Sequence, residues 1–556
     1  MAPTVDARTL SDGEIIDTDL CIVGAGTAGM TLAYQLRNQP FRICLVESGG
    51  LTPDPQTQDL HRGDNIGHPY FELHSARARH FGGTTNRWFI PCNGQAVGVR
   101  MRPLDPIDFE EREWVPYSGW PFRKETLDPY YDRAQRFCRI DPVSFQVADW
   151  SDAEHAALFD LRDTDAKTVI FKFGSRLPFV ETYYPAVRRA DNITILLHAN
   201  VTEILTDEDG HRVRELRVNC FGGKQLFIRA KRFVLAAGAL EIPRIMLLSN
   251  RQQTAGIGNQ HDLVGRFFME HPHFRTGIFV PSDARLFQTA ALYNHIHMVG
   301  SVPVIGKLAL KEPAIRRERL LNYVGELMPV MDLESSLYAF KIPRIDAQGV
   351  QAFRDLKTAV KRRKPPADLH RRLVQMLADI KPLSVSAYRN VKRRILSAVN
   401  KRRCMLFRLV NMSEQTPNPE SRVTLTYQQD ALGQKRIQLN WKLAPGDMQS
   451  AIRSQQLLDR ALQRAGLGRL YTEKEDEIIP RRIKGGWHQM GTTRMHADPK
   501  KGVVDGNSRV HGFSNLYIAG SSVFPTGGYA NPSLTLIALS LRLADHLNSK
   551  MVQRDN

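Results

Sequence analysis

The stretch DLCIVGAGTAGMTLAYQL, from Asp19 to Leu36, decides the fold of this chain. Its first residues, Asp19 to Val23, predict a buried strand, and its last, Met30 to Leu36, predict a helix. Between them lies the turn GAGTAG (Gly24 to Gly29), in which the first glycine permits the tight bend, the second lets the backbone approach a pyrophosphate, and the third lets the helix pack on the sheet. The helix N-terminus adds a favourable potential for phosphate. This stretch therefore predicts a dinucleotide site.

The next strand outward supports this prediction. Residues Arg42 to Val46 are apolar enough for a second buried strand, and Glu47 follows it, eighteen residues beyond Gly29. A carboxylate at this position accepts hydrogen bonds from ribose hydroxyls in dinucleotide-binding folds. The fingerprint alone does not distinguish NAD from FAD.

Two later passages repeat the pattern of a strand followed by glycine. They are RFVLAAG (Arg232 to Gly238) and LYIAG (Leu516 to Gly520), and helices are predicted after them at Ile242 to Leu248 and Pro532 to Leu547. Strands from three distant parts of the chain that all end in glycine predict one parallel sheet around a ligand.

A further glycine-rich turn, GGTTNRW at Gly82 to Trp88, brings the contacting segments to four. A cofactor enclosed by four separated segments is long and retained, which favours FAD over a dissociating nicotinamide.

The chain is expected to hold two interleaved domains, because 556 residues exceed what one hydrophobic core usually serves. We predict an α/β, discontinuous Rossmann-like FAD-binding domain from residues 1–99, 191–274 and 481–556. Residues 100–190 and 275–480 are predicted to form an α+β substrate-binding domain built on an antiparallel sheet. Alternating segments such as Arg422 to Tyr427 and Arg436 to Trp441 predict its strands.

Composition excludes disorder and a fibrous repeat, since 42% of the residues are hydrophobic and 24% are charged. The N-terminus lacks a basic start followed by an apolar run, and no eighteen apolar residues run together. We therefore expect a cytoplasmic protein, soluble or peripheral to the membrane. The six cysteines form no CxxC pair, so reduced structural thiols are expected.

Most of the net charge of +18 lies in one helical insert at about residues 350–404. Between Gln351 and Arg403 there are sixteen Lys or Arg and three Asp, a net charge of +13. In decreasing order of preference, this insert is a solvated helical face, a docking surface for an acidic electron-acceptor protein, an anchor on anionic lipid, or a nucleic-acid contact. The last is disfavoured because aromatic residues are few and no recognition motif is present.

The C-terminal part carries the densest motif. WHQMGTTRM (Trp487 to Met495) precedes LYIAGSSVFPTGGYANPSLT (Leu516 to Thr535). Together with GAGTAG, Glu47 and the GGTTN turn, it resembles, in order and spacing, the glucose-methanol-choline oxidoreductases. The resemblance is nearest to the branch of pyranose oxidases, glycoside 3-oxidases and fructose dehydrogenase-like subunits, which implies an FAD-dependent enzyme that oxidises an alcohol or a sugar-like CH–OH donor.

The resemblance implies that His488 lies over the flavin as the catalytic base and that Asn531 is its partner. Alcohol oxidation requires removal of the hydroxyl proton while hydride leaves the carbon, and imidazole titrates in the right range for this task. The Asn531 amide is suited to donate a hydrogen bond to the developing alkoxide. Both residues also allow a structural role, His488 in the core and Asn531 as the cap of the last helix.

The resemblance also implies a set of FAD-contacting residues. Arg87 stands before Trp88 where some relatives attach FAD through histidine, so we predict non-covalent FAD, with His80 as the second choice of attachment residue. The predicted FAD-binding residues are Gly24, Gly26, Thr27, Ala28, Gly29, Glu47, Ser48, Gly82, Gly83, Thr84, Asn86, Trp88, Val201, Ala237, Gly238, Gly520, Ser521, Asn531, Pro532 and Ser533.

A further polar segment contains two histidines but predicts no metal site. MEHPHF (Met269 to Phe274) predicts a strand that enters the substrate domain, and its alternating His271 and His273 lack a third ligand, so no metal site is predicted. Two alternatives stay open: a membrane-associated dehydrogenase that acts on a lipid-linked alcohol with a quinone or cytochrome as acceptor, and a flavin-dependent lyase on the same scaffold. A non-catalytic interaction protein is disfavoured because both His488 and Asn531 are present. The sequence does not indicate the electron acceptor, which is oxygen, a quinone or a cytochrome, or the oligomeric state.

Overall fold

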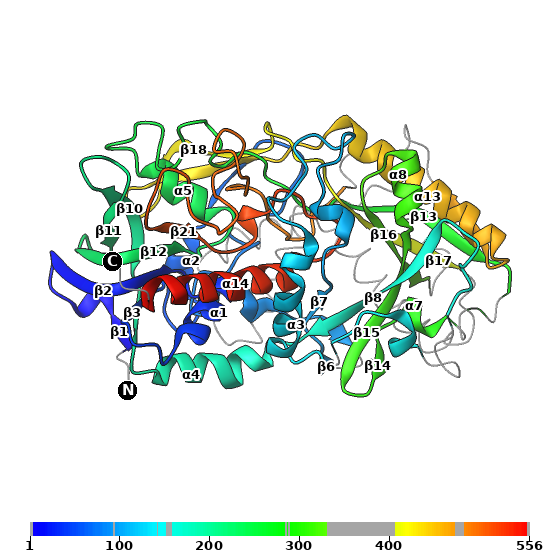
Figure 1. Cartoon of the computed structure of the whole chain (residues 1–556), viewed down its shortest axis with the longest axis horizontal. Helices are drawn as coiled ribbons and strands as arrows, with labels where there is room; N and C mark the ends of the chain where they lie inside the picture. Colours follow the sequence, from blue (N-terminus) through cyan, green and yellow to red (C-terminus); the bar gives the residue numbers. More distant parts are fainter. Residues whose placement is uncertain are drawn as a thin grey trace, which may run out of the picture.

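The computed structural model describes residues 4–92, 95–141, 143–151, 158–283, 286, 290–330, 406–472 and 483–552. Two eight-stranded sheets dominate this part of the chain and lie along its longest axis (Figure 1). The predicted basic insert at about 350–404 lies outside the described residues.

The first sheet has a parallel core, as predicted from the strand-then-glycine passages. Its order is β1-β9-β3-β2-β12, and β21 pairs with β12 on the same parallel pattern. β3 and β21 are wholly buried, β9 is nearly so, and β2 and β12 are buried in their last residues, which explains the continuous apolar runs in the sequence. The strands are β1 (Thr4–Asp6), β2 (Glu14–Val23), β3 (Ile43–Val46), β9 (Ile193–Leu197), β12 (Gln225–Leu235) and β21 (Leu516–Ile518).

The sheet is mixed rather than wholly parallel. Beyond β12 it continues with β11 (Val213–Asn219) and β10 (Asn200–Thr206), and both of these pairings are antiparallel. The long strand β12 makes this possible, because its first half pairs with β11 and its second half with β21. The sequence prediction of a parallel sheet is thus correct for the core and incomplete at this edge.

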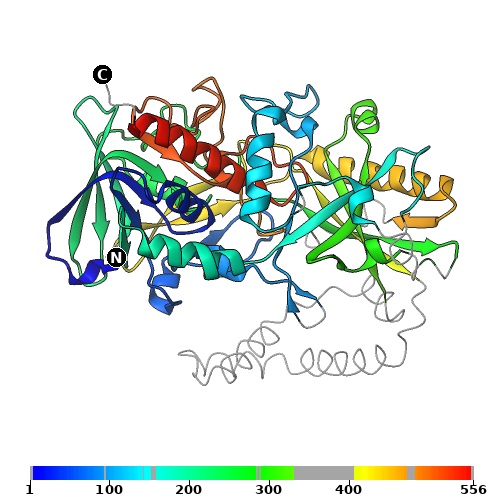
Figure 2. The ribbon, with the colours of Figure 1, turned by 60° about the horizontal axis from the view of Figure 1, so that its bottom comes forward.

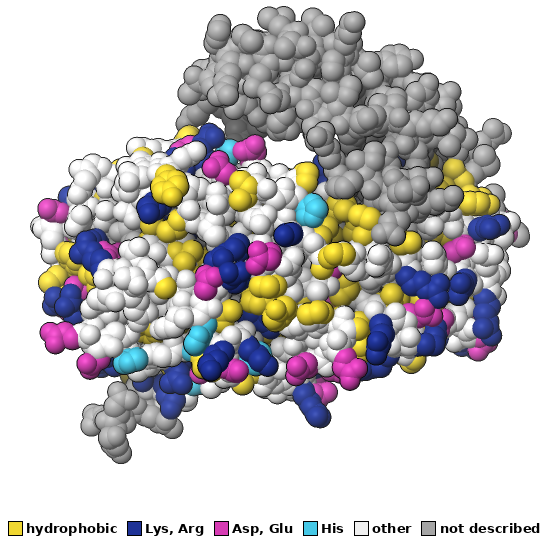
Figure 3. Space-filling view, turned by 90° about the horizontal axis from the view of Figure 1, so that it is seen from above, with side chains coloured by type: hydrophobic (Ala, Val, Ile, Leu, Met, Phe, Trp, Pro, Cys, Tyr) yellow, Lys and Arg dark blue, Asp and Glu magenta, His cyan; other side chains and the backbone are white. Residues whose placement is uncertain are grey.

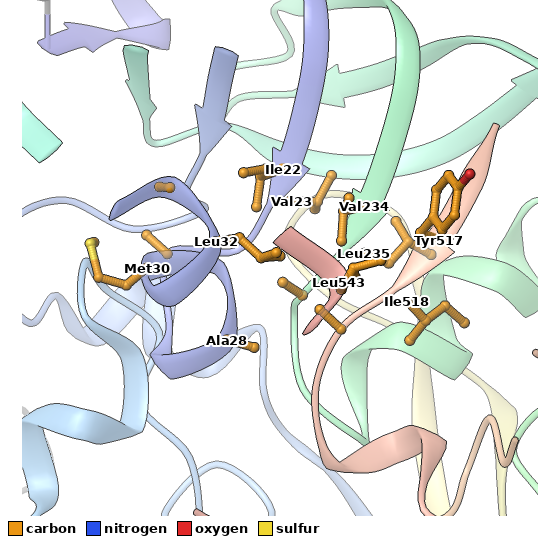
Figure 4. Close-up of a cluster of buried hydrophobic side chains, with 14 of the residues drawn as sticks. Ile22, Val23, Ala28, Met30, Leu32, Val234, Leu235, Tyr517, Ile518 and Leu543 are labelled. Atoms are coloured by element: carbon orange, nitrogen blue, oxygen red, sulfur yellow. The ribbon is translucent and has the colours of Figure 1, made fainter. Parts of the chain in front are cut away.

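Two helices pack against each other on this sheet and form its core. They are α1 (Thr27–Leu36), which begins within GAGTAG, and α14 (Pro532–Val552), which ends the described chain. Figure 4 shows their apolar side chains beside those of β2, β12 and β21, with Leu32 and Leu543 between the helices and the strands. The first and last parts of the sequence therefore share one core.

The second sheet is antiparallel and carries its own core. Its order is β20-β13-β17-β16-β15-β8-β7, with β14 paired to β15. Helix α13 (Pro445–Arg464) packs on it, as Figure 2 shows. The strands are β7 (Val99–Met101), β8 (Ala166–Gly174), β13 (His273–Pro281), β14 (His297–Val299), β15 (Val302–Leu310), β16 (Tyr323–Pro329), β17 (Phe407–Ser413) and β20 (Gly468–Thr472).

Two predicted strands of the substrate domain lie elsewhere. β18 (Arg422–Gln429) and β19 (Lys435–Asn440) pair antiparallel to each other, as predicted, but they form a separate three-stranded sheet with β4 (Gly63–Asn65). The polar stretch of β4 gives no alternating pattern, so the sequence did not indicate this pairing. The remaining helices include α2 (Pro55–Asp59), α3 (Asp128–Phe137), α4 (Tyr184–Arg189), α5 (Glu241–Leu248), α7 (Ala291–Asn294) and α8 (Glu312–Glu318).

The described surface matches the charge distribution of the sequence. On the face shown in Figure 3, basic and acidic side chains are interspersed over the described part of the chain. Among the described helices, none combines the length and apolar character needed to cross a bilayer. The cysteines whose side chains are described are free and buried: Cys21, Cys44, Cys138 and Cys220.

Candidate active site

The turn GAGTAG has the geometry that its glycines predict. Gly24 adopts a left-handed φ of +104°, and a Cβ on Gly29 would lie 1.9 Å from the Gly24 carbonyl oxygen, so neither position accepts a side chain. Gly26 differs, because a Cβ there would meet nothing within 4 Å. It is the N-cap of α1, with no side-chain cap. The first amide groups of α1 thus remain available for a phosphate.

Glu47 sits beside this turn at the end of β3. Its carboxylate accepts hydrogen bonds from the Ala25 amide at 3.0 Å and the Gly49 amide at 2.9 Å, and from the Ser48 hydroxyl at 3.2 Å. The side chain is buried, so these donors hold the charged carboxylate in place. Oε1 accepts from both Ser48 and Gly49, whereas Oε2 accepts only from Ala25, so Oε2 has a further lone pair that a ribose hydroxyl is able to use.

The GGTTNRW turn packs directly on GAGTAG. A Cβ on Gly83 would lie 3.0 Å from the Gly26 Cα, and the hydroxyls of Thr27 and Thr85 are 2.7 Å apart. The Asn86 amide nitrogen holds the turn itself, because it reaches the carbonyls of Phe81 and Gly83 and a ring nitrogen of His80. Gly82 is left-handed, Thr84 is exposed and Trp88 is buried.

The other predicted cofactor residues cluster at the ends of the same sheet. Gly238 follows β12 and Gly520 follows β21; both have positive φ, and a Cβ on either would meet nothing within 4 Å. Open space in front of Gly26, Gly238 and Gly520 fits an elongated ligand laid across the ends of the parallel strands. Ala237 is half-buried beside Gly238, Val201 is buried in β10, and Pro532 and Ser533 begin α14.

The two C-terminal motifs pair with each other. The amides of Gly491, Thr493 and Met495 donate to the carbonyls of Ser521, Ser522 and Val523 at 3.1, 2.9 and 2.7 Å. This ladder fixes His488, which precedes it, relative to the turn at Gly520. The sequence predicted that both motifs serve one site, and the structure brings them together.

His488 and Asn531 meet at their functional atoms. The Asn531 amide nitrogen lies 2.7 Å from His488 Nε2, and Asn531 is buried while His488 is half-buried. Asn531 Oδ1 is buried without a hydrogen-bond partner among the described residues. Burial lowers the pKa of His488 well below its usual value, and nearby His271 and His273 lower it further. The imidazole is therefore neutral at pH 7 and able to accept a proton.

A second histidine contacts the first. His271 Nδ1 lies 2.8 Å from His488 Nδ1, and His271 Nε2 lies 3.2 Å from the Gly527 carbonyl oxygen. His271 is fully buried, and burial lowers its pKa to about 4. His273 lies farther off, with ring centroids 6.3 Å from His488, and burial lowers its pKa to about 3.

Glu270 clamps the backbone of both histidines. Its carboxylate accepts hydrogen bonds from the amides of Gly486 and His488 at 2.9 Å each and from the His271 amide at 3.2 Å. The Tyr70 hydroxyl donates to the other carboxylate oxygen. Burial raises the pKa of Glu270 to about 7, although these four donors favour the charged form.

The second sheet presents charged groups on the side of these histidines. Lys307 on β15 and Arg100 on β7 share the Glu326 carboxylate at 2.9 and 3.0 Å. Their positive charges contribute to the low pKa of both His273 and His488. Burial lowers the pKa of Lys307 to about 8, and these two cations lower the pKa of Glu326 to about 2 against its burial.

Comparison with known proteins identifies the family. Two family models, both described as GMC oxidoreductase, match residues 166–273 and 417–540, and a third, described as an NAD(P)-binding Rossmann-like domain, matches residues 22–62. The 6'''-hydroxyparomomycin C oxidase of Streptomyces lividus is 30% identical over 95% of this chain and 92% of its own length. The chain belongs to the glucose-methanol-choline (GMC) oxidoreductase family.

Two other similar proteins agree with this assignment. The 5-(hydroxymethyl)furfural oxidase of Methylovorus sp. (strain MP688) is 25% identical, over 95% of this GMC oxidoreductase and 98% of its own length. The crystal structure of pyridoxine 4-oxidase from Mesorbium loti superposes with a TM-score of 0.51 at 17% identity, covering 95% of this chain and 98% of that one, which shows the same fold.

The cofactor of this GMC oxidoreductase is FAD, as the sequence predicted. The cradle fits it: Gly26, Gly238 and Gly520 leave room, the α1 N-terminus offers amides, and Glu47 offers a carboxylate. The residues that would hold it come from both ends of the chain, from the first βα unit and from the start of α14.

Sequence reasoning missed Glu270 and His271 as site residues. MEHPHF was assigned to a strand, but β13 begins only at His273, and of the preceding residues Met269 forms an isolated bridge to Met490. The available signal was the polar pair itself, because a buried Glu-His pair outside regular structure needs partners for its polar atoms.

Proposed function

We propose that this GMC oxidoreductase oxidises a CH–OH group with His488 as the base. The observation that carries the proposal is the convergence of His488 Nε2 and the Asn531 amide nitrogen at 2.7 Å. A substrate hydroxyl beside both groups would take the place of the Asn531 amide on the Nε2 lone pair, give its proton to the imidazole and accept a hydrogen bond from that amide. The geometry supplies both the acceptor and the donor that a developing alkoxide needs.

The residues around this pair prepare it for the task. The low pKa of His488 keeps the ring unprotonated at neutral pH, so the base is available before substrate binds. Glu270 holds the backbone of His488 through its amide, and the Asn531 position is fixed because α14 begins at Pro532. Bound FAD supplies the hydride acceptor, and non-covalent binding through the cradle remains our proposal for how it is held.

The substrate class follows from the family and from the relatives. The two relatives above are named for a hydroxyparomomycin and for 5-(hydroxymethyl)furfural. We propose a small alcohol, sugar or glycoside as substrate. The charged groups on the side of the histidines, Lys307, Arg100 and Glu326, are compatible with a hydroxyl-rich substrate, because they include both donors and acceptors for its hydroxyl groups.

Anaerobic flavin reduction tests the proposal. The purified enzyme is mixed with a panel of sugars, glycosides and simple alcohols without oxygen, and the flavin absorbance is followed. Bleaching by a member of the panel is expected, and His488→Ala is expected to abolish it while FAD stays bound. His211→Ala, on the surface, serves as the matched control. Turnover without bleaching would indicate a lyase, and retained bleaching in His488→Ala would refute the base.

The electron acceptor requires a separate experiment. Turnover with oxygen, and then with an artificial acceptor under nitrogen, distinguishes an oxidase from a dehydrogenase that delivers electrons to a quinone or cytochrome. For the basic insert at about residues 350–404, we propose first a solvated helical face. A docking surface for an acidic protein is the second choice, and an anchor on anionic lipid is the third. Flotation with anionic vesicles at low salt tests the lipid version, and no flotation eliminates it.

A further inference from the structure

The protons on the two contacting imidazoles are fixed by a main-chain carbonyl. The Gly527 carbonyl oxygen, 3.2 Å from His271 Nε2, only accepts hydrogen bonds, so His271 Nε2 carries the hydrogen. Neutral His271 therefore has its lone pair at Nδ1. His488 Nδ1, 2.8 Å away, must then be the donor, which leaves the lone pair of His488 at Nε2.

Nε2 is the nitrogen that faces Asn531. We propose that His271 is a positioning residue that holds His488 in the tautomer with a basic Nε2 and accepts a hydrogen bond from the imidazolium after proton transfer. This proposal rests on the proposed role of His488 as base. It assigns to a second histidine the orienting task that a carboxylate performs in many other catalytic histidine sites.

The backbone builds this contact from an antiparallel pairing. The amides of Met269 and Met490 each donate to the other's carbonyl at 3.0 Å. Two residues from this bridge, in opposite chain directions, lie His271 and His488, which therefore face each other across the pair. Next to His488, Trp487 adopts a left-handed φ of +61°. The pairing changes register there, because the next bridge joins His273 to Lys484.

The nearest carboxylate does not take the orienting role. The Glu270 carboxylate accepts from the amides of Gly486, His488 and His271 and from the Tyr70 hydroxyl, and neither imidazole ring is among its partners. A neutral acceptor stabilises the imidazolium less than a carboxylate would. His488 therefore stays unprotonated at neutral pH, which suits a group that begins the reaction as a base.

The proton balance of the step is simple. The substrate O–H bond breaks and its proton forms a bond with His488 Nε2, while the hydride leaves the carbon with its electron pair for FAD. The positive charge then lies on His488, whose Nδ1–H donates to His271 Nδ1. Because His271 Nε2–H donates to Gly527, the charge is spread along the chain of bonds rather than left on one buried ring.

The test compares His271→Asn with His271→Leu in the FAD-bound enzyme. The Asn side-chain oxygen occupies the place of Nδ1 and accepts a hydrogen bond, whereas Leu offers no acceptor. Anaerobic flavin reduction at saturating substrate is measured across pH. We expect His271→Leu to lose roughly a hundredfold in rate, with little change in substrate Kd and a base pKa shifted downwards, and His271→Asn to recover most of the rate. His211→Leu, which removes an exposed imidazole bonded to the Gly512 carbonyl and not to His488, is expected to match the wild type.

The outcomes separate this proposal from the proposed function. If His488→Ala is inactive while His271→Leu keeps the wild-type rate and pH profile, the positioning role is overturned and the base survives. If His488→Ala is active, both fall. If His271→Leu loses FAD, His271→Asp is used in its place. A carboxylate at this position is expected to raise the pKa of His488 relative to its pKa in His271→Asn. Identical pH profiles of His271→Asp and His271→Asn would overturn the proposal.

Discussion

The side-chain nitrogen of Asn531 lies 2.7 Å from Nε2 of His488, although the two residues are 43 positions apart in the chain. The ladder between the two C-terminal motifs makes this contact possible, and Ser521 reinforces it, because its hydroxyl donates to the Gln489 carbonyl at 2.7 Å. These bonds fix the backbone segments from which the two side chains reach each other.

Asn531→Ala is expected to slow flavin reduction on the order of a hundredfold, because the amide that would donate to the alkoxide is removed. Stopped-flow reduction under anaerobic conditions measures this rate. The same variant tests whether Asn531 has only a structural role as the cap of α14. An unchanged reduction rate combined with a lower Tm would show that it does.

Gly26 and Gly29 are expected to respond differently to the same substitution. Gly29→Ala places a Cβ 1.9 Å from the Gly24 carbonyl oxygen, so it should disrupt the packing of α1 and lower the yield of folded protein. Gly26→Ala meets nothing within 4 Å in the protein, so it should fold and yet bind FAD more weakly. Circular dichroism and FAD content measure the two effects. Full FAD content in folded Gly26→Ala would show that the open space is not the phosphate site.

FAD is expected to be released when the enzyme is precipitated with acid. Arg87 occupies the predicted attachment position, is exposed, and donates to the Ser75 carbonyl. His80, the second choice, shares its Nε2 with the Asn86 amide. A yellow pellet after acid precipitation would show covalent attachment, and mass spectrometry of the digest would then locate it.

The sequence predicted the parts of the fold whose signals are local. GAGTAG, Glu47 and the helix after Asn531 each follow from backbone requirements or from apolar periodicity. Pairings between distant segments were not predictable in this way. The polar strand β4 joins β18 and β19 only because the tertiary structure brings it there, and the His271 contact depends on a bridge between Met269 and Met490.

Acid is expected to destabilise the protein through its buried histidines. Burial lowers the pKa of His271 from an unfolded value of about 6.5 to about 4, so between these values the unfolded chain binds a proton that the folded chain does not. The stabilising contribution is present above pH 6.5 and is lost as the pH falls towards 4, with a slope of up to about 1.4 kcal/mol per pH unit. Urea unfolding at pH 7 and pH 5 measures it. His271→Asn should unfold with a smaller pH dependence, and an equal dependence would contradict the prediction.

Arg112 and Glu414 form a buried ion pair that ties the loop after residue 110 to the end of β17. The guanidinium donates to both carboxylate oxygens, at 2.6 and 2.9 Å, and both side chains are almost fully buried. Arg112→Met leaves the Glu414 charge uncompensated beside Asp108, whose pKa burial and the Glu414 charge already raise. Loss of one partner of such a pair typically costs about 3–5 kcal/mol, so a clear fall in Tm is expected.

Two further variants decide what the Arg112 result means. Arg162→Met breaks an exposed pair with Asp160 and should leave the Tm unchanged, because surface pairs contribute little. The double variant Arg112→Met, Glu414→Leu removes both charges and should recover most of the lost stability, since an apolar replacement leaves no buried charge. If the double variant were as unstable as Arg112→Met alone, the loss would come from packing and the uncompensated charge would not be its cause.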